Sequence, residues 1–170
     1  MEELSDIYTY AADIKRFLIC LTADVDLAEE LTQETFYQAV KSIERYNGEC
    51  KMTVWLCKIA KHTYYNHLKK EKRHHHRSVE QMIQMGYDVP SNADLPDVEV
   101  IKRNTLISIH KEIHLLNEPY REIFILRTSV NFSFKEIGEI FEKSENWARV
   151  TFYRAKLKLI ERIRGENIEL

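Results

Sequence analysis

Apolar side chains recur every three or four residues along most of this chain, which is the spacing of one face of an α-helix. The clearest such stripe consists of Met52, Trp55, Leu56, Ile59 and Thr63. Only four glycines and three prolines occur among 170 residues, a composition that suits helices better than a turn-rich sheet. The sequence therefore predicts an all-α protein.

Helix start and stop signals divide this pattern into segments. Asp24, Ser133 and Ser144 stand at N-cap positions, and Glu136 is placed to complete a capping box with Ser133. Pro119 suits a first helical turn, where its missing N–H costs nothing. We expect helices at about 3–22, 25–43, 51–72, 99–116, 118–130, 133–141 and 145–164.

The helical pattern is lost over residues 74–98, where Gly86, Pro90 and Pro96 occur. Such a stretch is typical of a linker. We therefore expect two small helical domains, residues 1–74 and 99–170, joined by a flexible linker at 75–98.

Charge is distributed unevenly, although the formal net charge is only −2. Residues 1–50 hold eleven acids and four bases, residues 51–77 hold eight bases and one acid, and residues 143–164 hold seven bases and two acids. An acidic surface followed by two basic stretches favours one protein partner and two contacts with nucleic acid. Ordinary solvated helix faces are the alternative.

A helix-turn-helix is the strongest local motif, with its first helix at 133–141 and its second from Glu145. Gly138 would allow close approach of the second helix. On that helix the core face would hold Ala148, Phe152, Ala155 and Leu159, which leaves Asn146, Arg149 and Tyr153 outward. In this motif the outward N-terminal residues enter the major groove, where Arg pairs with guanine and Asn with adenine. Phosphate contacts would come from Arg154, Lys156 and Lys158.

The helix at 51–72 carries a second stripe, polar and basic, made of Lys58, Lys61, Tyr65, Lys69 and Lys72. Aromatic rings among lysines can stack on unpaired bases. Trp55 fits the core better than a stacking role, and Tyr64 and Tyr65 fit either. The helix at 25–43 is instead acidic, and no His or third acid completes a catalytic or metal site there. A protein-docking face, or simple solvation of the charges, explains the acidic residues of this helix better.

The sequence does not favour a metal site, a catalytic site or a cofactor site. His74, His75 and His76 are consecutive and would point apart on a helix, so we expect no metal. No nucleophile–base pair or phosphate loop is present, and we expect neither an enzyme nor a cofactor. The three cysteines, together with the absence of a long apolar run or signal-peptide pattern, indicate a cytoplasmic protein without membrane insertion.

Three segments resemble one family, the extracytoplasmic-function sigma factors of bacterial RNA polymerase. The run Asp26-Leu27-Ala28-Glu29-Glu30-Leu31-Thr32-Gln33-Glu34-Thr35-Phe36 is similar to their polymerase-binding helix. Residues 45–49 and Trp55-Leu56-Cys57-Lys58-Ile59-Ala60 resemble their promoter-melting loop and the helix after it. Residues 116–122, followed by the helix-turn-helix to Ala155, resemble their C-terminal domain. His62 stands where many members carry Asn, and Trp147 replaces a smaller residue.

The resemblance implies a role for each segment. The acidic helix would dock on the β′ clamp helices of core polymerase. Its contact residues would be Asp26, Glu29, Glu30, Gln33 and Glu34. Core polymerase would also contact the protein through its β subunit. The loop and the helix after it would hold the −10 element with Tyr46, Asn47, Lys58, Lys61, His62 and Tyr65. The second helix of the motif would read the −35 element with Asn146, Arg149, Val150, Tyr153, Arg154 and Lys156. Promoter DNA and an anti-sigma factor are the further partners implied.

A stand-alone helix-turn-helix regulator with a ligand-sensing N-terminal domain is the alternative function. An acidic helix followed by a basic, Trp-containing helix argues against it, since ligand sensing needs neither.

Overall fold

The structure is a computed structural model that describes residues 7–71 and 108–166, named below the N-terminal half and the C-terminal half. Within these ranges the chain forms helices and no strand, so the predicted all-α fold is confirmed. The expected linker at 75–98 and the histidines at 74–76 lie outside the described residues.

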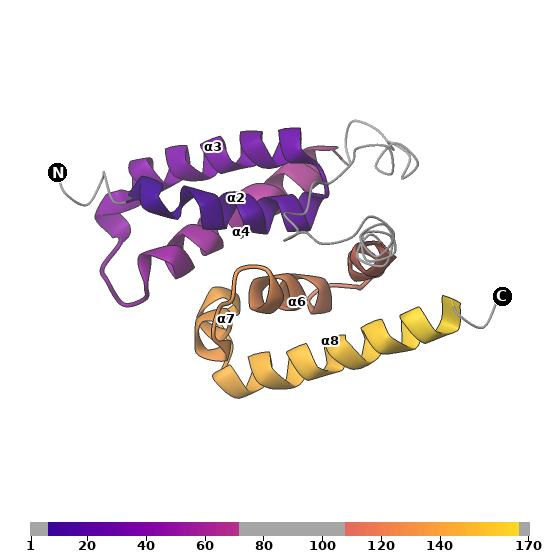
Figure 1. Cartoon of the computed structure of the whole chain (residues 1–170). Coiled ribbons are helices and arrows are strands. Elements are labelled where there is room, and N and C mark those ends of the chain that lie inside the picture. Colours follow the sequence, from indigo (N-terminus) through magenta and orange to yellow (C-terminus); the bar gives the residue numbers. More distant parts are fainter. Residues whose placement is uncertain (1–6, 72–107, 167–170) are drawn as a thin grey trace, which may run out of the picture.

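The N-terminal half consists of helices that run back and forth along one another (Figure 1). Its elements are η1 (Tyr8–Tyr10), α2 (Ala11–Thr22), α3 (Val25–Ser42), η2 (Ile43–Arg45) and α4 (Met52–Glu71). As predicted, Asp24 caps α3, because its side chain accepts a hydrogen bond of 3.0 Å from the Leu27 N–H. The helix expected at about 3–22 ends at Thr22, and its first residues lie outside the described range.

The C-terminal half begins with a helical stretch at residues 108–114. It continues with α6 (Tyr120–Thr128), α7 (Phe134–Phe141) and α8 (Glu145–Glu166). The capping box of α7 is formed: Ser133 Oγ accepts from the Glu136 N–H at 3.2 Å, and Glu136 Oε2 accepts from the Ser133 N–H at 2.7 Å. Ser144 Oγ accepts from the Trp147 N–H at 3.1 Å, as its expected N-cap role requires.

Replacing Ser133 with alanine is expected to destabilise the protein by about 1 kcal/mol, because the change leaves an N-terminal N–H of α7 without its acceptor. The measurement is the midpoint of urea unfolding followed by circular dichroism. Lys135→Ala is the matched control, since Lys135 is exposed on the same helix. Equal unfolding midpoints for the two variants would contradict a stabilising cap.

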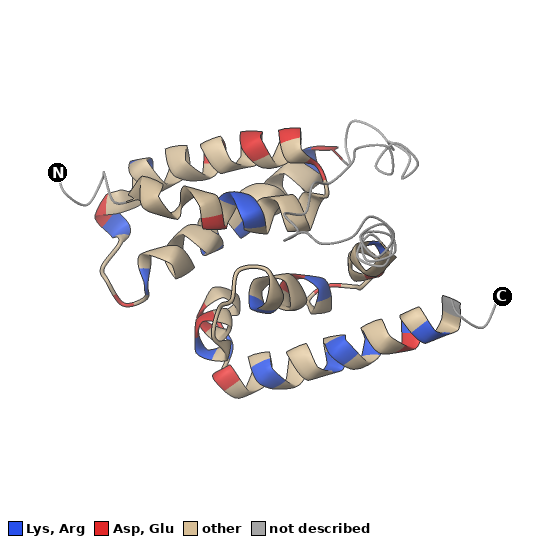
Figure 2. Ribbon diagram, viewed as in Figure 1, with Lys and Arg blue, Asp and Glu red and all other residues tan. Residues whose placement is uncertain are grey.

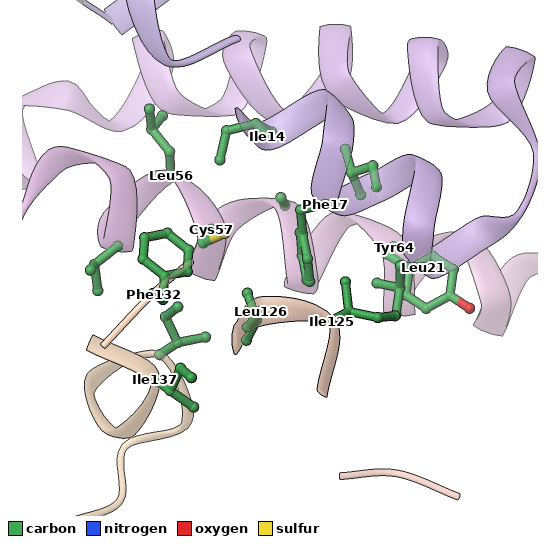
Figure 3. Packing of buried hydrophobic residues seen from close by; sticks show 14 of the residues in the cluster. Ile14, Phe17, Leu21, Leu56, Cys57, Tyr64, Ile125, Leu126, Phe132 and Ile137 are labelled. Atoms are coloured by element: carbon green, nitrogen blue, oxygen red, sulfur yellow. The ribbon is translucent and has the colours of Figure 1, made fainter. Parts of the chain in front are cut away.

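The two halves share one hydrophobic core. Helix α4 packs on α2 and α3 with one face and on α7 with another, and α2 also contacts α6. Figure 3 shows Cys57 of α4 beside Phe132, with Leu126 and Ile137 of the C-terminal half on the same side, while Leu56 points toward the other helices of the N-terminal half. All five of these side chains are buried. The described helices of the two halves therefore pack against one another in this structure, and the expected division into two domains stays a prediction.

This packing changes which residues of α4 are buried. The sequence predicts one buried stripe and one polar, basic stripe. Leu56 and Thr63 of the predicted buried stripe are buried, and the other buried positions are Val54, Cys57, Ala60 and Tyr64. Trp55 and Ile59 of the predicted stripe are only half-buried, and Lys61 and Tyr65 of the basic stripe are half-buried as well. A helix covered from two sides buries a wider arc than a surface helix, which one period of apolar residues does not reveal.

Among the described residues no helix combines the length and the apolar character needed to cross a membrane.

Candidate nucleic-acid interface

The angle between α7 and α8 depends on Gly138. A Cβ atom at this position would lie 2.8 Å from the carbonyl oxygen of Lys143 and 3.1 Å from the carbonyl carbon of Ser144. The Gly138 carbonyl oxygen also accepts a hydrogen bond of 2.8 Å from the Lys143 N–H. The turn backbone therefore rests directly on α7, and the close approach predicted for this glycine is confirmed.

The exposed face of α8 carries all six residues predicted for −35 contacts. Asn146, Arg149, Val150, Tyr153, Arg154 and Lys156 are exposed, and Tyr153 keeps 61% of its surface. On the opposite face Ala148, Ala155 and Leu159 are buried and Phe152 is half-buried. Basic residues recur along this helix in Figure 2. The division of faces expected from the sequence is therefore confirmed.

Arg149 is held in a defined position on this surface. Its guanidinium donates to Glu145 Oε1 at 2.6 Å and lies 5.6 Å from the Phe134 ring centroid. Because the pair is exposed, solvent screens it, so a base edge or phosphate can replace Glu145 at small cost.

The loop between η2 and α4 has a fixed internal structure. Tyr46 donates a hydrogen bond of 2.7 Å from its hydroxyl to the Cys50 carbonyl, and its ring lies 5.2 Å from that of Trp55. Asn47 Oδ1 accepts from the Glu49 N–H at 3.2 Å, and Gly48 has φ of 74°. Asn47, Gly48 and Glu49 are exposed at the tip. The tip of the loop thus presents polar groups, and these internal hydrogen bonds support its shape.

The predicted −10 residues on α4 have different environments. His62 is exposed, with its ring 3.2 Å from the Asn66 side-chain amide, and Lys58 is half-buried. Lys61 instead forms an ion pair of 3.3 Å with Glu122 of α6, and its ammonium lies 3.5 Å from the Phe141 ring centroid. The structure therefore does not place Lys61 and Tyr65 on an open surface together with His62.

The pairing residue Glu122 was not identified by sequence reasoning. Burial raises the pKa of its carboxyl group above the ordinary value, and Lys61 offsets part of that shift. Tyr65 hydrogen-bonds to the same carboxyl, and burial raises the pKa of the Tyr65 hydroxyl. Glu122 stands directly before the apolar run Ile123 to Leu126, and this position is the one sequence signal that could have pointed to a buried acid with a partner.

The acidic face of α3 is open. Asp26, Glu30, Gln33 and Glu34 are exposed, while Glu29 is half-buried and forms an ion pair with Lys15 of α2. That pairing lowers the pKa of the Glu29 carboxyl. Tyr37 extends the face, with 61% of its surface exposed. Figure 2 shows acidic residues near the N-terminal end of α3, away from α8.

No group of three or more His, Cys, Asp or Glu side chains in the described parts of the chain is placed to hold a metal ion.

Comparison with known proteins links both halves to one family. Residues 7–74 match the family described as Sigma-70 region 2, and residues 106–159 match Sigma-70, region 4. The RNA polymerase sigma factor YlaC of Bacillus subtilis (strain 168) is 27% identical over 162 residues, which are 93% of this chain and 90% of the relative. The ECF RNA polymerase sigma factor SigM of the same organism is 29% identical over 160 residues, 92% of each chain.

Solved structures share the fold over nearly the whole length. The sigma factor RpoE from Bartonella quintana, in complex with the anti-sigma factor NepR, superposes with a TM-score of 0.66 at 21% identity, over 94% of this chain and 95% of that one. CnrH, in complex with the cytosolic domain of CnrY, gives a TM-score of 0.66 at 14% identity over 95% of this chain and 88% of that one.

Proposed function

The chain belongs to the extracytoplasmic-function group of the sigma-70 family, and we propose that it binds core RNA polymerase and directs it to promoters with −35 and −10 elements. Members of this family are regulatory proteins that catalyse no reaction themselves. One observation carries the proposal: a single chain presents an exposed acidic helix face, a preformed loop and the outward face of a helix-turn-helix.

Polymerase docking is assigned to α3. Asp26, Glu29, Glu30, Gln33 and Glu34 lie along its outer side, where their charges can steer and register a basic partner surface. The β′ clamp helices are the proposed partner, with further contact to the β subunit. The exposed ring of Tyr37 supplies apolar area beside the charges.

Recognition of the −35 element is assigned to α8. Arg149 and Asn146 lie on the first turns of the second helix of the motif, which is the part that enters the major groove. Val150 and Tyr153 add apolar contacts to base edges, and Arg154 and Lys156 lie where phosphates would flank the groove.

Recognition and opening of the −10 element are assigned to the loop 46–51 and α4. Tyr46 and Asn47 would hold a flipped base, while Lys58, Lys61, His62 and Tyr65 follow the strand. On this proposal residues 1–74 form the unit that docks on polymerase and recognises the −10 element, and residues 99–170 form the unit that recognises the −35 element. Residues 75–98 connect the two units.

An anti-sigma factor is the proposed regulatory partner. The similar fold of RpoE, whose solved structure contains the anti-sigma factor NepR, supports this proposal. The proposed site of action is the cytoplasm, because the protein must meet core polymerase and promoter DNA there.

Run-off transcription tests the function as a whole. Core RNA polymerase is incubated with this protein and genomic fragments, and we expect transcripts with discrete starts that are absent with core alone. A chain that binds duplex DNA tightly and specifically on its own, and adds no starts with core, would instead be a stand-alone regulator. We expect weak duplex binding by the free chain, because its acidic N-terminal helices oppose the phosphates.

Reversing two charges of α3, Glu30→Lys with Glu34→Lys, is expected to weaken binding to core polymerase at least about tenfold, because like charges then face a basic partner. The measurement is the dissociation constant from fluorescence anisotropy with labelled sigma factor. The matched control reverses Glu44 and Glu161, two exposed acids outside the face. Equal loss of affinity in both double variants would assign the effect to net charge and remove the docking role of α3.

A further inference from the structure

Helix α8 carries a row of four exposed apolar side chains, named below the α8 seam: Val150, Tyr153, Leu157 and Ile160. Val150 keeps 40% of its surface, Leu157 45% and Ile160 41%, and Tyr153 is the most exposed of the four. Single exposed apolar residues are common on protein surfaces, but neighbouring ones in a row mark an interaction site. The seam therefore needs an explanation beyond the stability of the fold.

The spacing of the seam is that of a coiled coil. Steps of three, four and three residues correspond to positions a, d, a and d of two successive heptads. The core face of the helix lies opposite the seam, because Ala155 and Leu159 are buried at positions f and c and α8 packs on α6 and α7. The seam is thus a second apolar side of α8, and this side faces solvent.

Promoter recognition explains only the first half of the seam. Val150 and Tyr153 lie in the turns proposed to read base edges, but Leu157 and Ile160 lie about 6 and 10 Å further along the helix axis than Tyr153. A helix-turn-helix contacts bases with the N-terminal part of its second helix. Phosphates border the groove, and they bind polar and cationic groups rather than hydrocarbon. DNA binding therefore gives Leu157 and Ile160 no role.

Charged residues flank the seam on both sides. Arg149 and Lys156 occupy positions g, and Arg154 and Glu161 occupy positions e, and all four are exposed. Figure 2 shows lysine and arginine alternating with uncharged residues along this helix. With three bases and one acid, the rim of the seam is basic. Residues at e and g positions select the partner helix by charge, so the complementary helix is acidic.

From the seam and its rim we infer that α8 docks an amphipathic helix of a second protein, with apolar residues on the seam and acidic residues on the rim. The ion pair of Arg149 with Glu145 is exposed and screened by solvent, so an acid of the partner can replace Glu145 at small cost. The docking follows from exposure, spacing and charge alone.

A docked helix would also compete with promoter DNA. It would cover Val150 and Tyr153 and occupy Arg149 and Arg154, which the proposed function assigns to the −35 element. The helix and −35 DNA would therefore exclude each other. This part of the inference rests on the proposed function, and it names the surface on which a regulatory protein blocks −35 recognition.

A second copy of this chain fits the seam less well. Two α8 helices side by side would bring two basic rims together, and juxtaposed like charges disfavour association. The seam also extends over two heptads, fewer than the roughly three or four over which a coiled coil is usually sustained. An acidic helix gains attraction at the rim, where a second copy meets repulsion.

A designed peptide tests the docking on the full-length protein. The probe is a fluorescein-labelled synthetic helix of three heptads, with Leu at every a and d position and Glu at every e and g position. Repulsion between its glutamates keeps the free peptide from pairing with itself. Fluorescence anisotropy should show saturable binding to the wild type, and a peptide with Lys in place of Glu should bind at least about tenfold more weakly.

Serine substitutions place the peptide on the seam. Leu157→Ser with Ile160→Ser should weaken binding at least about tenfold, because two apolar side chains no longer contribute to the interface. The matched control, Val40→Ser with Leu115→Ser, removes two exposed apolar side chains elsewhere and should keep the wild-type affinity. All four positions are exposed, so neither double variant disturbs the core.

Run-off transcription with core polymerase tests the competition with DNA. Excess peptide should suppress the transcripts made with wild-type protein. The variant Leu157→Ser with Ile160→Ser should still transcribe and should resist the peptide, since neither residue is assigned to DNA. A wild-type protein that yields no transcripts would refute the proposed function, and the anisotropy measurements would still decide the docking.

Several results would overturn the inference. Docking is refuted if the wild type shows no saturable binding, if the two double serine variants bind the peptide equally, or if the Lys peptide binds as tightly as the Glu peptide. Equal inhibition of the wild type and of the seam variant refutes the competition with DNA. A wild-type dimer in multi-angle light scattering, abolished only by the seam variant, would assign the seam to a second copy.

Discussion

Replacing Gly138 with valine is expected to destabilise the protein by about 3 kcal/mol, the upper end of the range for overpacking a close contact. The first added atom would lie 2.8 Å from the Lys143 carbonyl oxygen, which belongs to the backbone and cannot rotate away. Relief requires the turn to move off α7, which breaks the bond of 2.8 Å from the Lys143 N–H to the Gly138 carbonyl. Because that turn sets the direction of α8, −35 recognition should be lost together with stability.

Gly165 provides a matched control for this substitution. It also lies in a helix, and a Cβ atom there would meet nothing within 4 Å. Gly165→Val should therefore leave the unfolding midpoint close to that of the wild type. The measurement is urea unfolding followed by circular dichroism, with run-off transcription on the same samples. If the two valine variants unfolded at the same midpoint, the close approach of the turn to Gly138 would not contribute to the stability of the protein.

Replacing Tyr46 and Asn47 with alanine is expected to reduce promoter opening at least about tenfold. This is the effect expected when the protein loses one contact that stacks on or encloses an unpaired base. Tyr46 holds the loop through the Cys50 carbonyl and the Trp55 ring, and Asn47 holds its tip through the Glu49 N–H. Without these contacts the loop loses its preformed shape, while α8 is unchanged. Permanganate reactivity of thymines near the −10 element measures opening, and protection of the −35 element measures initial binding.

Two further variants distinguish −35 recognition from promoter opening. Arg149→Ala should cost roughly 1–3 kcal/mol of −35 discrimination and lower promoter occupancy, yet occupied promoters should still open. Tyr46→Phe keeps the ring against Trp55 and removes only the hydroxyl, so its opening defect should be smaller than that of the double alanine variant. If Arg149→Ala abolished opening on fully occupied promoters, or if the loop variant destroyed −35 protection, the assignment of the two steps would be wrong.

Local signals in the sequence are sufficient for most of the secondary structure. Asp24 and Ser133 place the starts of α3 and α7 because a capping side chain bonds to an N–H only three residues away. The buried face of α8 follows from the spacing of Ala148, Ala155 and Leu159 alone, since helical periodicity is a property of the segment. The same reasoning correctly places Asn146, Arg149 and Tyr153 outside.

The partner of Lys61 was decided only by the tertiary structure. Its sequence position places it on a polar, basic stripe, but Glu122 and Phe141 approach it from helices far along the chain. Periodicity within α4 reports that the helix has an apolar side, and it carries no information about which distant helix covers its other side. Whether two helical groups joined by a linker stay apart or share a core depends on the complementarity of their surfaces, which is the sum of many contacts between residues remote in sequence.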